Sequence, residues 1–312
     1  MTRSRTPDIT RAGRVALVGR PNVGKSTLLN ALVGQAIAIT SPQPQTTRAA
    51  VRGITTRAGA QYLFVDTPGL HAPRSRLGER MNAAAREAAA EADAVVYLVA
   101  AATGVGGAPA LSDPDVKLLT SLPPRPTLLA INKIDRLESK ESLLPFLASM
   151  ASAFGETRFE AMIPVSARRA DGTDRLLDAL APLLPEQPML FDPDTLSDQP
   201  ARFFVAELVR EQVLRKTRHE VPHGVAVIVE AFDETGPAAR IEATIHVARE
   251  SHKKIVIGAG GQMLKAIGSA ARGRVERMLD RKVHLRLHVR ATPGWMDNDA
   301  RLRELGYGEG LS

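Results

Sequence analysis

Cysteine is absent from this 312-residue chain, and its absence removes several kinds of chemistry at once. Without thiols the protein forms no disulfide bond, no thiolate metal site and no cysteine nucleophile. Long hydrophobic runs are missing too, since no stretch reaches the roughly 18 uninterrupted apolar residues that a membrane-spanning helix requires. The first 11 residues are polar and lack the apolar core of a signal peptide, so we expect them to be disordered. These absences favour a cytoplasmic protein of ordinary globular domains.

Negative charge is scarce in one segment. Between Arg249 and Arg290 the sequence has eleven Lys and Arg residues against three acidic ones, a net charge of +8. The whole chain carries +7, so the remainder sums to about −1. Basic charge confined to one segment is typical of a surface that binds a polyanion such as nucleic acid. A solvated surface in an arginine-rich protein gives the same count, and charge alone leaves both interpretations open.

The length of the chain and a change of pattern near residue 185 predict two domains. Up to that point apolar strands alternate with helical patterns, which favours an α/β fold with a mostly parallel, doubly wound sheet. A four-residue turn, residues 57–60, joins the second and third strands, which we expect to form an antiparallel edge hairpin. The expected strands are Arg14–Val18, Ala50–Thr55, Gln61–Val65, Ala94–Val99, Thr127–Ile131 and Ala161–Val165, and the expected helices are Lys25–Val33, Leu77–Glu91, Asp113–Leu122, Ser139–Phe154 and Thr173–Leu183.

The remaining sequence predicts a linker and a smaller α+β domain. Residues 185–200 are rich in Pro, Asp and Gln and show no apolar periodicity, as a linker would. The pattern after them is helix Arg202–Lys216, strands Gly224–Ala231 and Ala238–Val247, helices Ser251–Val256 and Gly261–Leu279, and strand Lys282–Val289. The expected organisation is therefore a disordered N-terminus (1–11), a first domain (12–185), a linker (186–200), a second domain (201–291) and a tail (292–312).

Residues 19–26 read G-x-x-x-x-G-K-S, the pattern of a phosphate-binding P-loop. A strand precedes the motif and a helix comes after it, which is the context that such a loop requires. Gly19 and Gly24 let the backbone curl so that N–H groups and the helix N-terminus point at phosphate oxygens. Lys25 supplies a cation for the β- and γ-phosphates, and the Ser26 hydroxyl is a ligand for Mg²⁺. The motif predicts a nucleoside triphosphate without saying which one.

A second motif, Asp66-Thr67-Pro68-Gly69, comes after an apolar strand. On its own this sequence is a common turn. Downstream of a P-loop it acquires a function, because an acidic residue at the end of a neighbouring parallel strand lies beside the phosphates. There Asp66 can hold Mg²⁺ through water, and the Gly69 N–H can sense the γ-phosphate.

A third motif, Asn132-Lys133-Ile134-Asp135, indicates the base. The Asp135 carboxylate can accept two hydrogen bonds from guanine, at N1–H and the exocyclic amine, whereas adenine offers neither donor. Lys133 can lie across the purine, and Asn132 can tie the base site to the P-loop. At the end of the next strand, a backbone N–H of Ser166-Ala167 can meet guanine O6. The sequence therefore predicts GTP.

In this order, the motifs resemble the Ras-like translation-factor class of GTPases over residues 14–184. The resemblance implies GTP hydrolysis, with GTP or GDP and Mg²⁺ as ligands. It also implies that residues 43–48, Gln43-Pro44-Gln45-Thr46-Thr47-Arg48, are the first switch loop, in which either Thr46 or Thr47 coordinates Mg²⁺; we favour Thr47. The expected catalytic residues are Asn22, Lys25, Thr47 and Gly69, and the expected metal ligands are Ser26, Thr47 and Asp66. The expected nucleotide contacts are Gly19, Arg20, Pro21, Asn22, Val23, Gly24, Lys25, Ser26, Thr27, Asp66, Thr67, Pro68, Gly69, Leu70, Asn132, Lys133, Ile134, Asp135, Ser166 and Ala167.

One position departs from the pattern of Ras, in which a Gln after the Asp-x-x-Gly motif orients the attacking water. This chain has Leu70 there, and its side chain neither donates nor accepts a hydrogen bond. We expect the amide oxygen of Asn22 to coordinate a monovalent cation that bridges the β- and γ-phosphates, as in potassium-activated relatives. The sequence thus predicts slow hydrolysis that K⁺ accelerates more than Na⁺.

Within the basic segment, Gly258-Ala259-Gly260-Gly261 lies between two expected helices. This G-x-x-G resembles the loop of a KH domain, which clamps about four single-stranded nucleotides. The element order matches a type II KH domain. Many KH domains carry Lys or Arg at the two variable positions, so here we expect flanking lysines and loop amides to make more of the phosphate contacts. The expected RNA-binding residues are Lys253, Lys254, Ile257, Gly258, Ala259, Gly260, Gly261, Lys265 and Arg272.

The two domains together resemble the Era-like family of bacterial GTPases, in the TrmE-Era-EngA superfamily. Matching segments outside the nucleotide motifs are Glu220-Val221-Pro222-His223, Ile255-Val256-Ile257-Gly258, Gly294-Trp295 and Leu305-Gly306-Tyr307. The resemblance implies binding to the 3′ end of 16S ribosomal RNA and a role in assembly of the 30S ribosomal subunit. It also implies loose peripheral association with the inner face of the cell membrane, although the sequence contains no lipid-anchor signal. We expect a monomer.

Two other functions stay open on sequence alone. One is a tRNA-modification or membrane-associated GTPase whose C-terminal unit binds protein, and the other is a P-loop ATPase or kinase. RNA binding separates the first from the leading interpretation, and nucleotide selectivity separates the second. The single Trp295 also allows two roles: it can stack on a base, or it can pack against the core near a C-terminal helix. We favour packing, which is the commoner role of a lone tryptophan.

Overall fold

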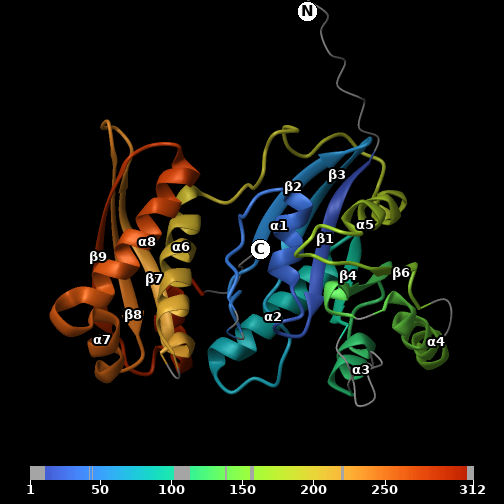
Figure 1. Cartoon of the computed structure of the whole chain (residues 1–312), viewed down its shortest axis with the longest axis horizontal. Helices are drawn as coiled ribbons and strands as arrows, with labels where there is room; N and C mark the ends of the chain where they lie inside the picture. Colours follow the sequence, from blue (N-terminus) through green and yellow to red (C-terminus); the bar gives the residue numbers. More distant parts are fainter. Residues whose placement is uncertain are drawn as a thin grey trace, which may run out of the picture.

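Two units lie side by side (Figure 1). The computed structural model describes residues 11–41, 43, 45–101, 113–137, 139–154, 158–218 and 221–307. The expected disorder of residues 1–10 lies outside this part of the chain. Arg11, which we expected in that disordered end, instead begins strand β1 and pairs with Ala60. Its guanidinium donates to the carbonyls of Pro182 and Leu184, which ties the start of the domain to its last helical turn.

The first unit is a six-stranded sheet with the strand order β2-β3-β1-β4-β5-β6. Neighbouring strands are parallel except for β2 and β3, which form the expected antiparallel edge hairpin. Separate hydrophobic clusters pack on its two faces, which confirms the doubly wound α/β fold. The elements are β1 (Arg11–Gly19), α1 (Lys25–Val33), β2 (Val51–Arg57), β3 (Ala60–Asp66), α2 (Arg76–Glu91), β4 (Ala94–Ala100), α3 (Asp113–Thr120), β5 (Thr127–Asn132), α4 (Leu143–Phe154), β6 (Ala161–Pro164) and α5 (Thr173–Leu180).

The second unit is a small α+β domain with a three-stranded sheet in the order β7-β8-β9. β7 and β8 are antiparallel, whereas β8 and β9 are parallel, which confirms the expected order helix-strand-strand-helix-helix-strand. Its core lies between the sheet and the helices. The elements are α6 (Ala201–Lys216), β7 (Val225–Asp233), β8 (Ala239–Val247), α7 (Glu250–Ile257), α8 (Gln262–Leu279) and β9 (Val283–Ala291), with α9 (Asp299–Glu304) in the tail.

The segment expected as a linker is docked against the first sheet. The Ile54 N–H of β2 donates to the Leu196 carbonyl at 2.8 Å, and the Gln61 amide of β3 donates to the Phe191 carbonyl at 2.8 Å. Arg52 also forms an ion pair with Asp198. The linker therefore runs along the hairpin edge and fixes where α6 begins.

The tail packs between the two units. Trp295 has no exposed surface, its indole N–H donates to the Gly224 carbonyl, and its ring stacks on Tyr307 at a centroid distance of 5.7 Å. Both aromatic residues belong to a hydrophobic cluster with Leu77 and Met81 of α2. Because Trp295 is buried, it cannot stack on a base, and the core-packing role is the correct one. None of the helices in the described ranges is long and apolar enough to cross a membrane.

Candidate GTPase site and its contacts with the second domain

A pocket of about 380 Å³ lies at the carboxyl edge of the first sheet. Parallel strands bring their following loops to this edge, so segments far apart in the sequence meet there. The pocket is lined by residues of the P-loop, by residues 39–41 and 45–47, and by Gly69, Lys133 and Arg136. Asn22 of the P-loop also lines it and is exposed, and its left-handed backbone (φ 64°) directs the turn.

The P-loop backbone has the curled form that phosphate binding requires. Gly24 has φ 104°, and a Cβ there would collide with the side-chain amide of Asn132. Lys25 is buried, and its Nζ donates to the carbonyls of Gly19 and Arg20 at 3.1 Å each. Burial lowers the pKa of Lys25 to about 8, although nearby Asp66 opposes the shift. A phosphate anion would restore the charge that burial disfavours.

Three oxygen-bearing side chains from three segments converge at the start of α1. The hydroxyls of Ser26 and Thr47 lie 2.8 Å apart, and they donate to Asp66 Oδ2 at 2.6 and 3.1 Å. Within the described residues, the buried Asp66 Oδ1 has no hydrogen-bond partner. Thr46, the alternative ligand in the first switch loop, turns its hydroxyl to the carbonyl of Gln43 at 2.7 Å. Of the two threonines, Thr47 is therefore the one that lies at the Ser26–Asp66 pair.

Hydrogen bonds link the residues expected to recognise the base to one another and to the P-loop. Asn132 is buried, donates to the Val23 carbonyl at 2.8 Å and accepts from the Ala167 N–H at 3.0 Å. Lys133, held at φ 67°, donates from Nζ to the Asn22 carbonyl. Asn132 and Lys133 thus connect the base side of the pocket to the P-loop.

Asp135 is held in place by one hydroxyl. Ser166 donates to Asp135 Oδ1 at 2.7 Å, and this hydrogen bond holds the pKa of the carboxyl below its usual range. The Ser166 N–H donates to the Asp171 carbonyl, and the Ala167 N–H donates to Asn132. Both N–H groups already have protein partners. For the expected contact with guanine O6, one of these N–H groups would have to donate to guanine as well as to its protein partner.

Gly69 and Leu70 lie directly beneath the P-loop. A Cβ at Gly69 would come within 2.7 Å of the Pro21 nitrogen, so only glycine fits this close approach. The Leu70 N–H donates to the Gly19 carbonyl at 3.2 Å, while its side chain is buried in the core with Ala85 and Ala89 of α2. Leu70 therefore contributes backbone at the site, and its side chain does not line the pocket.

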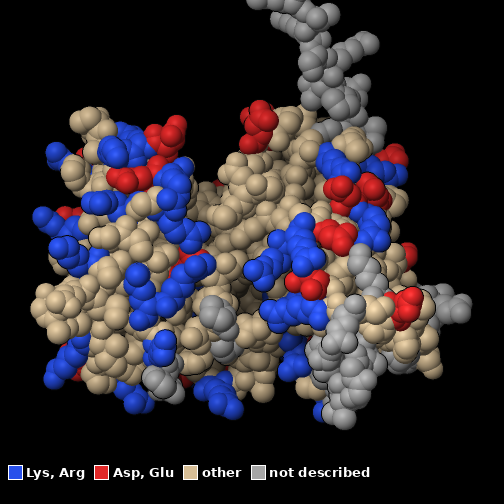
Figure 2. Space-filling model, in the orientation of Figure 1, with Lys and Arg blue, Asp and Glu red and all other residues tan. Residues whose placement is uncertain are grey.

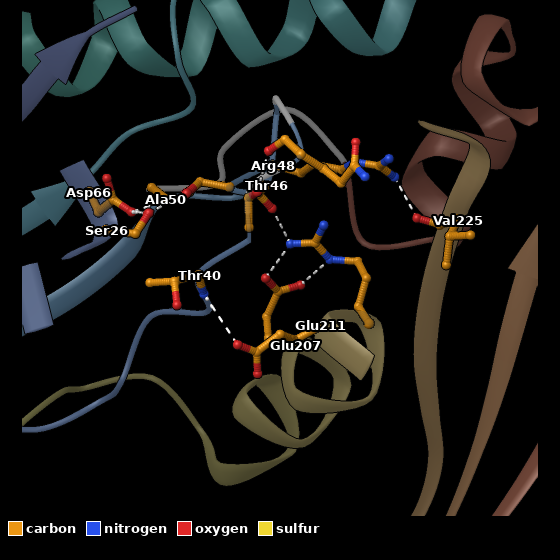
Figure 3. Close-up of polar contacts among 12 residues, drawn as sticks. Ser26, Thr40, Thr46, Arg48, Ala50, Asp66, Glu207, Glu211 and Val225 are labelled. Atoms are coloured by element: carbon orange, nitrogen blue, oxygen red, sulfur yellow. Dashed lines mark hydrogen bonds and ion pairs between the residues drawn. The ribbon is translucent and has the colours of Figure 1, made fainter. Parts of the chain in front are cut away.

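The second domain contacts the first switch loop, which sequence reasoning missed (Figure 3). Arg48 donates to three carbonyls at the start of β7, those of Pro222 (3.0 Å), His223 (2.7 Å) and Val225 (2.5 Å). From α6, Arg210 donates to the Thr46 carbonyl. These partners are separated by more than 160 positions in the chain, so no local pattern could have predicted them.

The G-x-x-G loop joins α7 to α8 and is open to solvent. Ala259 and Gly260 are exposed, and a Cβ at Gly260 or Gly261 would meet nothing within 4 Å. Gly258 instead packs closely on Met263, since a Cβ there would come within 2.7 Å. Of the expected RNA-binding residues around the loop, Lys254, Lys265 and Arg272 are exposed, whereas Lys253 and Ile257 are partly buried. Figure 2 shows Lys and Arg side chains gathered on the visible face of this domain.

Family models and relatives cover nearly the whole chain. Residues 14–133 match the model described as a 50S ribosome-binding GTPase, and residues 220–295 match the KH domain. GTPase Era of Bordetella avium is 43% identical over 299 residues, covering 95% of this chain and 98% of the relative. GTPase Era of Geotalea daltonii is 45% identical over 297 residues, covering 95% of this chain and 97% of the relative.

Two solved structures cover 96% of this chain and 99% of their own, each at 34% identity. One is Aquifex aeolicus Era bound to GDP·AlF₄⁻, with a TM-score of 0.89. The other is Era in complex with MgGDPNP and nucleotides 1506–1542 of 16S ribosomal RNA, with a TM-score of 0.90. Because each score covers both units together, the units have similar relative positions in all three structures.

The fold and the site define a P-loop GTPase joined to a C-terminal KH domain. The nucleotide motifs precede the KH domain in one chain, and the linker and tail connect the two. With more than 40% identity over 95% of its length, the chain belongs to the GTPase Era family.

Proposed function

We propose that this GTPase binds Mg²⁺–GTP in the pocket described above and uses hydrolysis to control binding of the 3′ end of 16S ribosomal RNA during assembly of the 30S subunit. One observation carries the proposal. The first switch loop, which places Thr47 beside Ser26 and Asp66, also lies against the KH domain that bears the G-x-x-G loop. A change at the γ-phosphate therefore acts directly on a contact with the RNA-binding domain.

The residues at the start of α1 fit Mg²⁺. The ion prefers hard oxygen ligands and keeps several waters, and it is held by few protein groups together with phosphates. Two hydroxyls and a carboxylate, one of whose buried oxygens has no hydrogen-bond partner among the described residues, meet that description. The part of the chain that the structure describes contains no group of three or more His, Cys, Asp and Glu that would form a dense metal cage. We assign Ser26 and Thr47 as direct ligands and Asp66 as a ligand through water.

Guanine selection falls to Asp135. Its lowered pKa keeps the carboxylate charged, so it can accept from both guanine donors, while Asn132 and Lys133 hold the base side of the pocket against the P-loop. Gly69 lies directly against Pro21 of the P-loop, and we assign its N–H to the γ-phosphate. Lys25 then exchanges its P-loop carbonyl partners for phosphate oxygens.

The side chain at position 70 cannot orient the attacking water, because Leu70 neither donates nor accepts a hydrogen bond and is also buried. We assign part of the missing charge stabilisation to a K⁺ ion held by the exposed Asn22 side chain at the pocket. An ion there would offset the charge that develops between the β- and γ-phosphates, as a positioned arginine does in other GTPases.

RNA binding falls to the open loop between α7 and α8 and to the exposed cations beside it. The loop glycines let the chain approach phosphates, and the flanking lysines supply charge. The Era relative solved with nucleotides 1506–1542 of 16S ribosomal RNA supports this choice of RNA. A ribosomal partner supports a cytoplasmic location, and the peripheral membrane association implied by the family stays a prediction.

Two binding measurements test the proposal. A single-stranded oligonucleotide with the sequence of the 16S rRNA 3′ end should bind in competition with labelled ribosomal RNA, whereas an oligonucleotide of scrambled sequence should not compete. No RNA binding at moderate salt would favour a GTPase whose second domain binds protein. GTP should bind far more tightly than ATP, and equal affinities would contradict the role of Asp135.

A further inference from the structure

We propose that Arg210, a residue of the KH domain, is a positioning residue of the GTPase site. It holds the peptide unit between Thr46 and Thr47, and so keeps the Thr47 hydroxyl beside Ser26 and Asp66. This inference rests on the GTPase function proposed above and makes the KH domain a structural part of the Mg²⁺–GTP site.

Arg210 is buried at the interface, with a side chain only 1% exposed. Its Nε donates to Glu207 Oε1 at 2.8 Å, and its Nη2 donates both to Glu207 Oε2 at 2.5 Å and to the Thr46 carbonyl. Burying a guanidinium is costly unless its charge is paired and its N–H groups are bonded. Glu207 pairs the charge. Among the residues that the structure describes, none accepts a hydrogen bond from Nη1, so the bond to Thr46 is the one by which this guanidinium reaches the first domain.

The Thr46 carbonyl matters because it belongs to the same peptide unit as the Thr47 nitrogen. A peptide unit is planar, so the Thr46 oxygen and the Thr47 nitrogen move as one rigid group. Holding the oxygen from α6 therefore constrains the position of the Thr47 Cα, from which its side chain extends. That side chain ends 2.8 Å from Ser26 Oγ and 3.1 Å from Asp66 Oδ2. Figure 3 shows Glu207 on α6 facing the loop at Thr46. Ser26 and Asp66 lie on the far side of that loop from α6.

The other contacts between the KH domain and this part of the chain do not hold the Thr46–Thr47 peptide unit. On the N-terminal side, Glu211 and Arg215 bond the backbone of Thr40, before the first switch loop begins. On the C-terminal side, Arg48 reaches the start of β7 through its own side chain. In the described ranges of the KH domain, Arg210 is the residue that bonds the backbone directly next to Thr47.

Removing Arg210 should therefore weaken Mg²⁺ binding and hydrolysis in the GTP-bound state and leave the affinity for GDP unchanged. GDP has no γ-phosphate, so it does not depend on Thr47. Changing a residue that orients a metal ligand typically costs roughly 10- to 100-fold in metal affinity or activity. Replacing Arg210 alone would leave the Glu207 carboxylate without its cationic partner, so the main variant is Glu207→Gln with Arg210→Met, which removes both charges and keeps similar volumes.

The experiment compares four full-length proteins: wild type, the double variant, Arg210→Lys, and the control Arg202→Ala. Arg202 lies on the same helix and is exposed. For each protein we measure the melting temperature, hydrogen exchange of residues 43–48 without nucleotide, affinities for GDP and for non-hydrolysable GTP, and single-turnover hydrolysis against Mg²⁺ concentration. Lysine keeps the charge but lacks the fork of donors, so Arg210→Lys should recover only part of the effect.

For the double variant we expect faster exchange in residues 43–48, GDP affinity within about twofold of wild type, and a rise on the order of 10- to 100-fold in the Mg²⁺ concentration for half-maximal hydrolysis. Wild-type exchange together with wild-type Mg²⁺ dependence would overturn the proposal. A parallel loss of GDP affinity and melting temperature would overturn it too, because the role would then be general stability. If wild type fails to hydrolyse GTP, the proposed function fails, while the exchange measurement still decides the role of Arg210.

Discussion

The guanidinium of Arg48, in the first switch loop, lies 5.8 Å from the centroid of the Trp295 ring in the tail. The same guanidinium donates to three carbonyls at the start of β7, and Trp295 is packed against α2 through its hydrophobic cluster. Arg48 therefore joins the GTPase domain, the KH domain and the tail at one buried point. A loop that reorders on hydrolysis would change all of these contacts together.

Replacing Arg48 by alanine should weaken docking of the two domains. Hydrogen bonds from a charged group contribute about 1.5–3 kcal/mol, and the cation–π contact with Trp295 adds to them. We expect a larger radius of gyration by small-angle scattering with a GTP analogue, and a changed emission of the single tryptophan. Arg57→Ala, which removes an arginine at the hairpin turn, is the control. A compact Arg48→Ala protein with unchanged emission would show that this contact does not hold the domains.

Replacing Asp135 by asparagine should change base selection. The amide presents one donor where guanine needs an acceptor, so GTP affinity should fall by on the order of 100-fold or more. Xanthosine triphosphate carries a carbonyl in place of the exocyclic amine and should bind the variant better than GTP does. Competition against a fluorescent GDP analogue measures both affinities. Unchanged preference for GTP would remove Asp135 from base recognition.

Replacing Asn22 by alanine should abolish stimulation by K⁺ while GTP still binds. Because the amide oxygen is the proposed ligand of a cation between the phosphates, the variant should hydrolyse GTP at the same slow rate in K⁺ and in Na⁺. Initial rates at constant ionic strength give the comparison. Full K⁺ stimulation in the variant would place the cation elsewhere or remove it from the mechanism.

Adding negative charge to the G-x-x-G loop should weaken RNA binding without affecting the fold. Ala259 and Gly260 are exposed, Gly260 has open space around it, and aspartate tolerates its left-handed backbone better than most residues. We expect the Ala259→Asp, Gly260→Asp protein to lose at least about tenfold in RNA affinity at moderate salt. Ala83→Asp, on the exposed face of α2, adds charge away from the loop and should bind RNA normally. Equal affinity of all three proteins would exclude the loop.

Much of the site could be predicted because its chemistry is local. The P-loop, Asp66 and residues 132–135 each lie at the end of an apolar strand, and parallel strands bring such loops to one edge. The hairpin and the order of elements in the KH domain could be predicted for the same reason, since periodicity and turns are properties of neighbouring residues. The choice of Thr47 over Thr46 came from the resemblance, and the orientation of the two hydroxyls agrees with it.

The unpredicted features depend on contacts between distant segments. Arg48 and Arg210 look like ordinary charged residues in the sequence, and only the docked domains give them partners. The linker shows no periodicity because its backbone and a few side chains hold it to β2 and β3. The sequence shows that Leu70 stands where Ras has a glutamine, but only the structure shows that its side chain is buried against α2.

Coupling between the GTPase site and the RNA site is measured by titrating a 16S rRNA 3′-end oligonucleotide with the full-length protein in three states: loaded with a non-hydrolysable GTP analogue, loaded with GDP, and empty. The first switch loop contacts the KH domain in the structure, so we predict tighter RNA binding in the GTP-analogue state than in the GDP state. In the double variant of Glu207 and Arg210 this difference should shrink. The same RNA affinity in all three wild-type states would contradict the proposed switch, because the two sites would then be uncoupled.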